Sequence, residues 1–270
     1  LHPESNVQFG EGGAGTFSDG KLNTGTRDRR MGWMLREFAA HGAPESVVYD
    51  AKPHIGTDIL IDVVQSIRRE VIDLGGEVRF GHRLERLNFA CGWLTGAVVH
   101  CAENEYTLPC ERLILAIGHS ARDTFENLNA QGVPMQPKPF SMGVRIEHLQ
   151  KNIDLAQYGR ERGDLPAADY SLNVHPPDGT SAYTFCMCPG GEVFAAASET
   201  GGVVTNGMSY YARDRENANS ALLVGVGPED FGSDHPLNGM YWQRRREENA
   251  FRAGGGTYAA PAQRVEDLLK

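Results

Sequence analysis

The sequence predicts a mixed α/β (α+β) fold with two domains. The first is expected to contain a parallel sheet and a small antiparallel meander, and the second a mixed or antiparallel sheet. Three observations support this prediction. An apolar helical stripe runs from Leu60 to Leu74, short alternating segments follow it, and a continuous apolar run occupies residues 112–118. Continuous apolar runs of this length are typical of strands covered on both faces, as in parallel sheets.

Composition and charge limit the classes of partner. The chain has 270 residues, of which 40% are hydrophobic, enough to fill one large core or two ordinary ones. Its formal net charge is −9, so we expect no nucleic-acid partner. No stretch approaches the roughly 20 apolar residues that span a bilayer, and the first residues lack a signal pattern. We therefore expect no membrane partner and a cytoplasmic location.

The first third of the chain predicts a loop followed by two helices. Glycines from Gly10 to Gly25 indicate a shaped loop. A helix is expected at residues 30–41, ended by Gly42, and a longer one begins at Thr57 or Asp58 and ends at the next glycine pair. Its apolar face comprises Leu60, Val63, Val64, Ile67, Val71 and Leu74.

Short strands are expected after this helix, at residues 77–80, 83–87, 94–99 and 106–108, and they predict the meander. The apolar run at residues 112–118 is then predicted to be a buried parallel strand. Ser120 and Asp123 have the spacing of a capping box that opens a helix containing Phe125 and Leu128.

Prolines 134, 137 and 139 predict an interdomain crossing, which divides the chain into domains at residues 1–136 and 137–270. The second domain is expected to contain strands and then helices. The strands lie at residues 140–146, 183–187 and 192–197, and the helices at residues 206–224 and 237–252.

Two motifs in the opening loop look like nucleotide-binding signatures but lack the required context. Residues 10–15 satisfy G-x-G-x-x-G, yet later glycines interrupt the helix that must follow. Residues 15–21 match a phosphate-binding loop, but Leu22 stands where a magnesium-binding Ser or Thr is required. What the loop retains is successive backbone amides and the polar side chains of Ser18, Asp19 and Lys21.

The five cysteines contain no C-x-x-C pair and no histidine at zinc-ligand spacing, so we expect neither a metal site nor a disulfide scaffold. Strand periodicity would place Cys186 and Cys188 on the same face. They are interpreted either as small apolar side chains under a sheet or as a redox-active thiol pair.

Several segments, taken together, carry a family resemblance. They are residues 10–22, 51–58, 115–125, 137–148, 186–191, 195–199 and 205–209. They resemble a bacterial family of uncharacterised FAD-dependent dehydrogenases, relatives of the glutathione-reductase-like flavoproteins, over nearly the whole chain. The resemblance implies that residues 1–136 are part of a Rossmann-like FAD-binding domain and residues 137–270 a substrate domain. We expect an internal fragment that lacks the family's N-terminal βαβ unit and C-terminal glycine-rich segment.

The resemblance implies an FAD-dependent oxidoreductase that transfers a hydride between flavin and a small organic substrate or NAD(P)H. It implies cofactor contacts from Glu11, Gly12, Gly13, Ala14, Gly15, Thr16, Ser18, Asp19, Lys21, Gly118 and His119. Candidates for catalytic roles are Lys21, His54, Arg145 and Asn206. The isolated chain is expected to bind FAD weakly or not at all, because the pyrophosphate loses its helix terminus.

Other interpretations stay open. Arg145 can be a strand-surface salt-bridge partner, Asn206 a helix N-cap, and His54 and His119 simple hydrogen-bonding groups. At the level of function, the alternatives are a non-catalytic ligand- or partner-binding module on the same fold, and a thiol-redox protein that uses Cys186 and Cys188.

Overall fold

The structure is a computed structural model that describes residues 2, 4–23, 28–102, 104–177, 179 and 181–269. It contains two compact units, each assembled from segments that lie far apart in the sequence. Unit 1 comprises Leu1–Glu70, Phe140–Val226 and Arg246–Lys270, and unit 2 comprises Val71–Pro139 and Gly227–Arg245. Both units therefore draw on both sides of residue 136, and the predicted division into flavin and substrate domains stays a prediction.

The first part of unit 1 contains the two helices that the sequence predicts, together with two short helices that it does not, one of them within the expected loop. The helices are α1 (Gly13–Thr16), α2 (Met31–Ala40), the 3-10 helix η1 (Glu45–Val48) and α3 (Thr57–Asp73), whose last turn belongs to unit 2. Gly42 follows α2 with a φ of 104°, a conformation that favours glycine. The expected stripe on α3 is buried at its start, where Leu60 and Val63 pack with Ala43, Val47 and Ile55 in one core.

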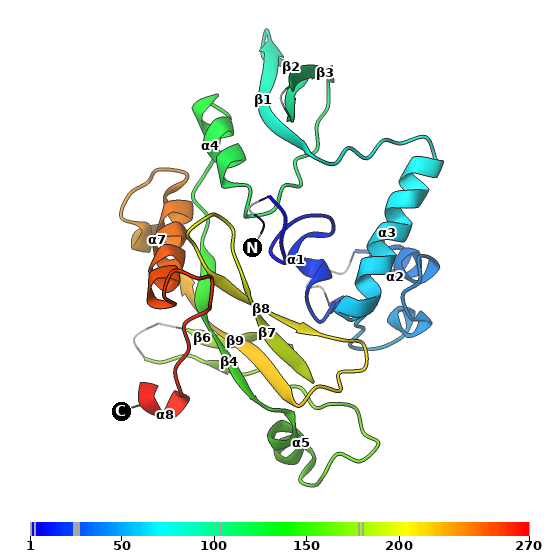
Figure 1. The fold of residues 1–270 in the computed structure, drawn as a ribbon, viewed down its shortest axis with the longest axis vertical. Coiled ribbons are helices and arrows are strands. Elements are labelled where there is room, and N and C mark those ends of the chain that lie inside the picture. The colour runs from blue at the N-terminus through cyan, green and yellow to red at the C-terminus, as the bar shows by residue number, and fades with distance from the viewer. Residues whose placement is uncertain are drawn as a thin grey trace. The chain divides into compact units, whose positions relative to one another are not determined.

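The second part of unit 1 contains two antiparallel sheets (Figure 1). A four-stranded sheet has the order β4-β9-β6-β5, from β4 (Phe140–Leu149), β9 (Asn217–Val226), β6 (Ala182–Cys188) and β5 (Asn173–Val174). A two-stranded sheet pairs β7 (Gly191–Ala196) with β8 (Val204–Ser209). Helix α5 (Gln150–Tyr158) follows β4 directly, and the short helix α8 (Val265–Leu268) lies near the end of the described chain.

The helix expected at residues 206–224 is wrong, because this stretch forms most of β8, a loop and β9. Strand β9 is central in its sheet and hydrogen-bonds to β4 on one side and β6 on the other. Asn, Ser and Gly at the start of the stretch are poor helix formers, and its end, Leu222-Leu223-Val224-Gly225-Val226, is a short apolar run. Periodicity alone does not separate such a run from a helix.

Unit 2 contains the predicted meander. Strands β1 (His82–Ala90), β2 (Trp93–Cys101) and β3 (Asn104–Pro109) pair antiparallel in the order β1-β2-β3. Helix α4 (Arg122–Ala130) packs on β1. The unit also holds α6 (Pro228–Phe231) and the first half of α7 (Asn238–Ala253), which confirms the last helix that the sequence predicts.

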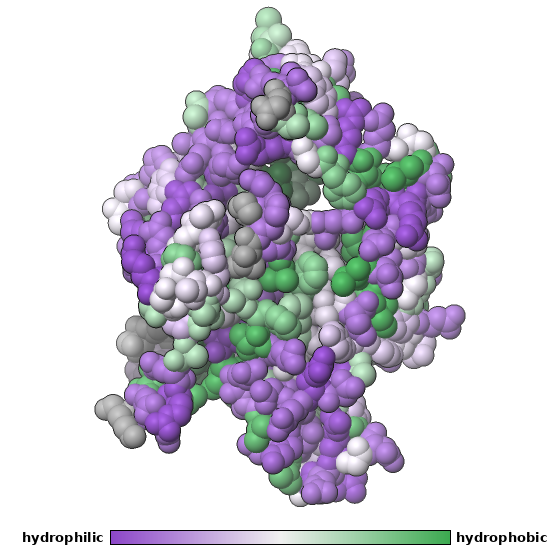
Figure 2. All heavy atoms as spheres, in the orientation of Figure 1, coloured by the Kyte–Doolittle hydropathy of each residue, from purple (hydrophilic) through white to green (hydrophobic). Residues whose placement is uncertain are grey.

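Two strands predicted in this region are absent. Residues 77–80 and 112–118 belong to no strand in the structure, and every strand pairing among the described residues is antiparallel. Ile114, at the centre of the apolar run, is 91% exposed. Apolar side chains left exposed among hydrophilic ones are also visible in Figure 2. The run has the composition of a parallel strand, but the described residues provide no strand beside it.

The predicted capping box is also wrong. The N-cap of α4 is Ala121, which makes no side-chain capping hydrogen bond, and the Asp123 carboxylate instead accepts a hydrogen bond from the N–H of Thr124 at 2.9 Å. Among the described residues, no helix combines the length and apolar character needed to cross a membrane.

Candidate functional site

The opening loop and the segment around His54, two parts of the family resemblance, form one structure within unit 1. Three backbone hydrogen bonds join residues 19–22 to residues 53–56 at N···O distances of 3.0 to 3.1 Å. Lys21 and His54 form an antiparallel bridge between them. The loop therefore has a fixed conformation that presents Lys21 from a defined backbone position.

Side chains from two other elements anchor the same loop. The hydroxyl of Thr57, at the start of α3, donates to the carbonyl of Thr16 at 2.7 Å. The amide of Asn206, on β8, donates to the carbonyl of Phe17 at 2.7 Å. Asn206 therefore anchors the loop from a strand. The alternative that it is a helix N-cap is wrong, because no helix begins there.

A buried carboxylate lies at the centre of the site. Asp19 is 1% exposed and accepts two hydrogen bonds from the guanidinium of Arg213, at 2.9 and 2.5 Å. The ammonium of Lys21 lies 3.6 Å from the same carboxylate and also donates to the carbonyl of Met187 on β6. A buried carboxylate needs such paired cations, since desolvation alone disfavours its charged form.

A third cation, Arg145 on β4, enters the site from the four-stranded sheet. Its guanidinium donates to the side-chain oxygen of Asn219 at 2.6 Å and reaches the carbonyl of Cys186 at 3.5 Å. Asn219 is fully buried, and its Nδ2 has no hydrogen-bond partner among the described residues. Gly207 lies against both side chains, and a Cβ there would overlap them. Arg145 therefore has a buried amide partner.

The strand carrying Cys186 and Cys188 is irregular. The register of β6 against β9 shifts between Phe185 and Cys188, and Cys186 has a φ of 49°, which is uncommon for a residue other than glycine. The pKa of Cys186 is lowered to about 6, chiefly by a hydrogen bond from Cys188 and also by the charges of Lys21 and Arg145, which together outweigh the opposing effects of burial and Asp19. The hydrogen bond to Cys186 and burial raise the pKa of Cys188.

The site has an excess of positive charge. Lys21, Arg145 and Arg213 are cations, and Asp19 is the carboxylate that links two of them. The chain as a whole carries a formal charge of −9, so the positive charge of this site is opposite in sign to the net charge of the chain. A local excess of positive charge at a partly buried place favours an anionic ligand or a charge that becomes negative during a reaction.

His54 is held in one orientation beside Lys21. Its Nε2 lies 3.0 Å from the carbonyl oxygen of Tyr211, and its ring stacks on the Tyr211 ring with centroids 5.1 Å apart. A carbonyl oxygen only accepts, so Nε2 carries the proton in this arrangement. In the neutral ring, Nδ1 is then the nitrogen able to take up a proton.

The other sequence-predicted residues lie in two places. Glu11 pairs with Arg68 of α3 at 3.3 Å, and Ser18 closes the loop by donating to the carbonyl of Gly15 at 2.7 Å. Thr16 Oγ1 is buried with no hydrogen-bond partner among the described residues, and a Cβ at Gly12 would overlap it. The remaining loop residues, Gly13 and Ala14, lie in α1. Gly118 and His119 are exposed residues of unit 2, and their approach to the same ligand stays a prediction.

Sequence reasoning missed Arg213, Asn219 and a half-buried pair of side chains elsewhere in unit 1. Arg213 lies in the loop between β8 and β9, and Asn219 on β9, in the stretch that was expected to be helical. The pair is His148 and Tyr170, whose side chains lie 2.8 Å apart. Burial lowers the pKa of His148 and raises the pKa of Tyr170. No local motif marks these residues, because their partners lie on other strands.

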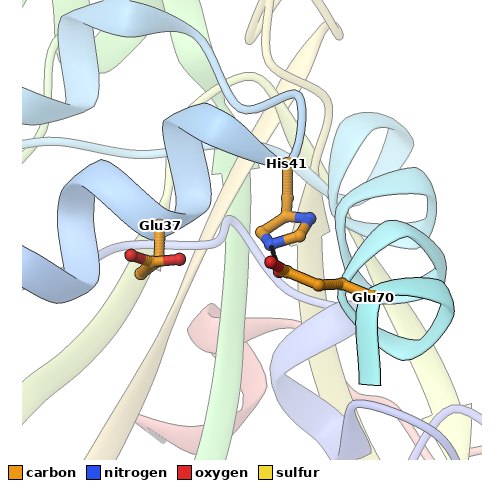
Figure 3. Close-up of side chains that lie close together, drawn as sticks. All are labelled: Glu37, His41 and Glu70. Carbon is orange, nitrogen blue, oxygen red and sulfur yellow. Dashed lines mark ion pairs between the residues drawn. The ribbon is translucent and has the colours of Figure 1, made fainter. Parts of the chain in front are cut away.

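A separate cluster in unit 1 also escaped the sequence analysis. Glu37 and His41, from α2 and its C-terminal cap, and Glu70, from α3, have ligand atoms within 4.8 Å of one another (Figure 3). His41 Nε2 lies 2.6 Å from the Glu70 carboxylate, and its Nδ1 lies 3.0 Å from the Ser66 hydroxyl. Protein groups therefore satisfy both ring nitrogens without an ion, and the His41–Glu70 pair joins α2 to α3.

The second part of the chain is similar to a known family of FAD-dependent proteins. Residues 139–270 match the family described as "FAD-dependent protein, C-terminal domain-like". An uncharacterised protein of Clostridium beijerinckii is 52% identical over 273 residues, covering 100% of this chain and 50% of the relative. The chain thus spans about half the length of that relative. A structure of a triple mutant of the flavin-dependent brominase Bmp2 is similar at a TM-score of 0.39, with 11% identity, covering 91% of this chain and 59% of the other.

Proposed function

We propose that this chain, whose residues 139–270 match an FAD-dependent protein family, is part of a longer FAD-dependent oxidoreductase. The reaction would transfer a hydride between flavin and a small organic substrate or NAD(P)H. The observation that carries the proposal is a cluster of three cations in unit 1. Lys21 and Arg213 pair with the buried Asp19 carboxylate, and Arg145 reaches the backbone of Cys186, next to the Met187 carbonyl that Lys21 contacts. We propose that this cationic cluster lies at the isoalloxazine ring.

The residues present fit such a ligand. Buried polar atoms of Thr16 and Asn219 are left without partners among the described residues, and a ligand's carbonyl and ring-nitrogen atoms would satisfy them. Gly12 and Gly207 allow Thr16 and Asn219 to pack directly against the backbone, where a Cβ would overlap them. The local excess of positive charge fits a ring system that becomes negatively charged on reduction.

The chemistry of hydride transfer would come from the bound FAD, and the protein would bind, orient and tune it. Lys21 would stabilise negative charge at the ring edge that it faces, and Asp19 would fix the position of Lys21. His54 would accept a proton at Nδ1 while Tyr211 holds Nε2. Arg145 would contribute a further positive charge, oriented by its hydrogen bond to Asn219.

Flavin binding provides the experimental test. We expect the longer protein that contains this sequence to purify with a visible flavin spectrum that bleaches on reduction. We expect the isolated chain to bind FAD more weakly than about 1 μM, because residues 112–118 find no parallel sheet among the described residues to support an ADP site. Titration of both proteins with FAD, followed by fluorescence, measures the difference.

Two results would count against this proposal. A colourless longer protein that takes up no FAD on reconstitution would favour a ligand-binding module on the same fold. Sub-micromolar FAD binding by the isolated chain would mean that this chain alone is sufficient to bind the ADP half of FAD. Heat-denatured chain provides the control for non-specific fluorescence quenching.

A further inference from the structure

Cys186 and Cys188 have an arrangement that an ordinary strand does not give. In a regular strand, two residues separated by one lie on the same face about two rises apart. Here the bulge after Phe185 and the left-handed φ of Cys186 bend the chain, and the Cys188 thiol donates to the carbonyl of Cys186 at 3.3 Å. A hydrogen bond between the two side chains is also the largest cause of the lowered pKa of Cys186.

The two thiols differ in access. Cys186 is partly exposed, whereas Cys188 is completely buried. A reagent from solution therefore meets Cys186 first. Cys188 is reached only from within the protein, from the neighbouring sulfur.

They differ in charge state as well. The groups that act on Cys186 are the Cys188 thiol, Lys21 on the opening loop, Arg145 on β4 and the carboxylate of Asp19. Three of these favour the thiolate, and Asp19 opposes it while being neutralised by Arg213. Thiolates, not thiols, attack sulfur, so this environment favours nucleophilic attack by Cys186 at neutral pH.

We propose that Cys186 and Cys188 form a reversible dithiol–disulfide couple, in which Cys186 attacks an organic disulfide and Cys188 resolves the resulting mixed disulfide. A position held in a sparsely populated backbone conformation beside convergent charges is a frequent property of functional sites. The inference does not depend on flavin binding, so its test and the test of the proposed function can fail separately.

The exchange balances in two steps. The Cys186 thiolate bonds to one sulfur of the organic disulfide, whose S–S bond breaks and releases one thiolate. The Cys186 charge, which helps to raise the pKa of Cys188, disappears in this step. In the second step, the Cys188 sulfur bonds to Cys186 Sγ, and the S–S bond of the mixed disulfide breaks and releases a second thiolate. The proton of Cys188 passes to one of the released thiolates. The two cysteines lose two electrons, and the organic disulfide gains them.

The experiment uses the 270-residue chain with Cys91, Cys101 and Cys110 replaced by serine, which leaves the pair as the remaining cysteines. The probe is 5,5′-dithiobis(2-nitrobenzoate), an aryl disulfide that releases a coloured thiolate. We expect two equivalents of thiolate per chain, no bound adduct, and a mass lower by two hydrogens. With Cys188→Ser added, we expect one equivalent and a stable adduct on Cys186. With Cys186→Ser added, we expect a reaction at least about tenfold slower.

The rate of alkylation of Cys186 by iodoacetamide, measured against pH, gives a second readout that a purely structural role would not change. We expect a midpoint near pH 6. Lys21→Met should raise the midpoint, because it removes a nearby positive charge. Lys52→Met is the matched control, since the Lys52 side chain is 71% exposed and pairs with Asp169 elsewhere, and it should leave the midpoint unchanged.

Circular dichroism of each variant establishes that it is folded before the chemistry is compared. The inference is overturned if the pair ends as adducts without an internal disulfide. It is equally overturned if the alkylation midpoint lies near the ordinary thiol value of about 8.5.

Discussion

Replacing Asp19 by alanine is expected to lower the free energy of unfolding by about 3 to 5 kcal/mol. Asp19 is 1% exposed, and its carboxylate accepts hydrogen bonds from two nitrogens of the Arg213 guanidinium. It also lies 3.6 Å from the Lys21 ammonium. Without the carboxylate, two partly buried cations face each other with no compensating charge. Urea denaturation followed by circular dichroism measures the loss.

An exposed pair of similar geometry provides the control. Glu105 accepts two hydrogen bonds from Arg86, at 3.1 and 2.7 Å, but both side chains are about half exposed. Water and ions screen such pairs, so Glu105→Ala should have a far smaller effect on stability. If Asp19→Ala and Glu105→Ala lower the free energy of unfolding equally, burial of the Asp19 carboxylate does not make its ion pair more stabilising.

Replacing Gly56 by alanine is expected to destabilise the chain by about 3 kcal/mol or more. Gly56 has a φ of 84°, and a Cβ there would overlap the backbone nitrogen of Tyr211 and the Asp58 carboxylate. The overlap involves backbone, so no side-chain rotation relieves it. The same substitution would separate residues 53–56 from the Tyr211 loop and displace His54. Thermal unfolding measures the loss of stability.

Gly75 separates the two causes of this effect. Its φ of 87° nearly equals that of Gly56, but a Cβ there would meet no atom within 4 Å. Gly75→Ala should therefore lose only the left-handed backbone preference, about 1 to 2 kcal/mol. If both variants lose the same stability, the close approach of Tyr211 to Gly56 contributes nothing.

Elements whose signals are local could be predicted from the sequence. Helix α3 has a long 3.6-residue stripe with glycines at its end, and the meander has short alternating segments separated by turns. The helices at Met31–Ala40 and Asn238–Ala253 were found for the same reason. Each of these signals lies within the element that it specifies.

Elements that depend on distant partners could not be predicted. The interior of β9 is polar at one end and apolar at the other, and only its pairing with β4 and β6 makes it a strand. The opposite error occurred at residues 112–118, which have the composition of a buried strand but find no partner among the described residues. In both cases, the deciding interaction involves chain far away in sequence.

The candidate site shows the same limit. Lys21, His54, Arg145, Asn206 and Cys186 were singled out from the sequence, and the fold of unit 1 links each of them to the opening loop or to the sheet beside it. Arg213 and Asn219, which hold the charges of this site in place, carry no motif. Their roles follow from burial and pairing, which only the folded chain shows.

If the cationic cluster around Asp19 faces a flavin, as we propose, it sets the reduction potential of that flavin. The measurement compares Lys21→Met with Lys52→Met in the longer protein that contains this sequence, by dye-linked reductive titration. We predict that Lys21→Met lowers the two-electron potential by roughly 30 mV or more, about 1.4 kcal/mol, and that Lys52→Met leaves it unchanged. A potential that is the same in both variants and in the unsubstituted protein would contradict the account.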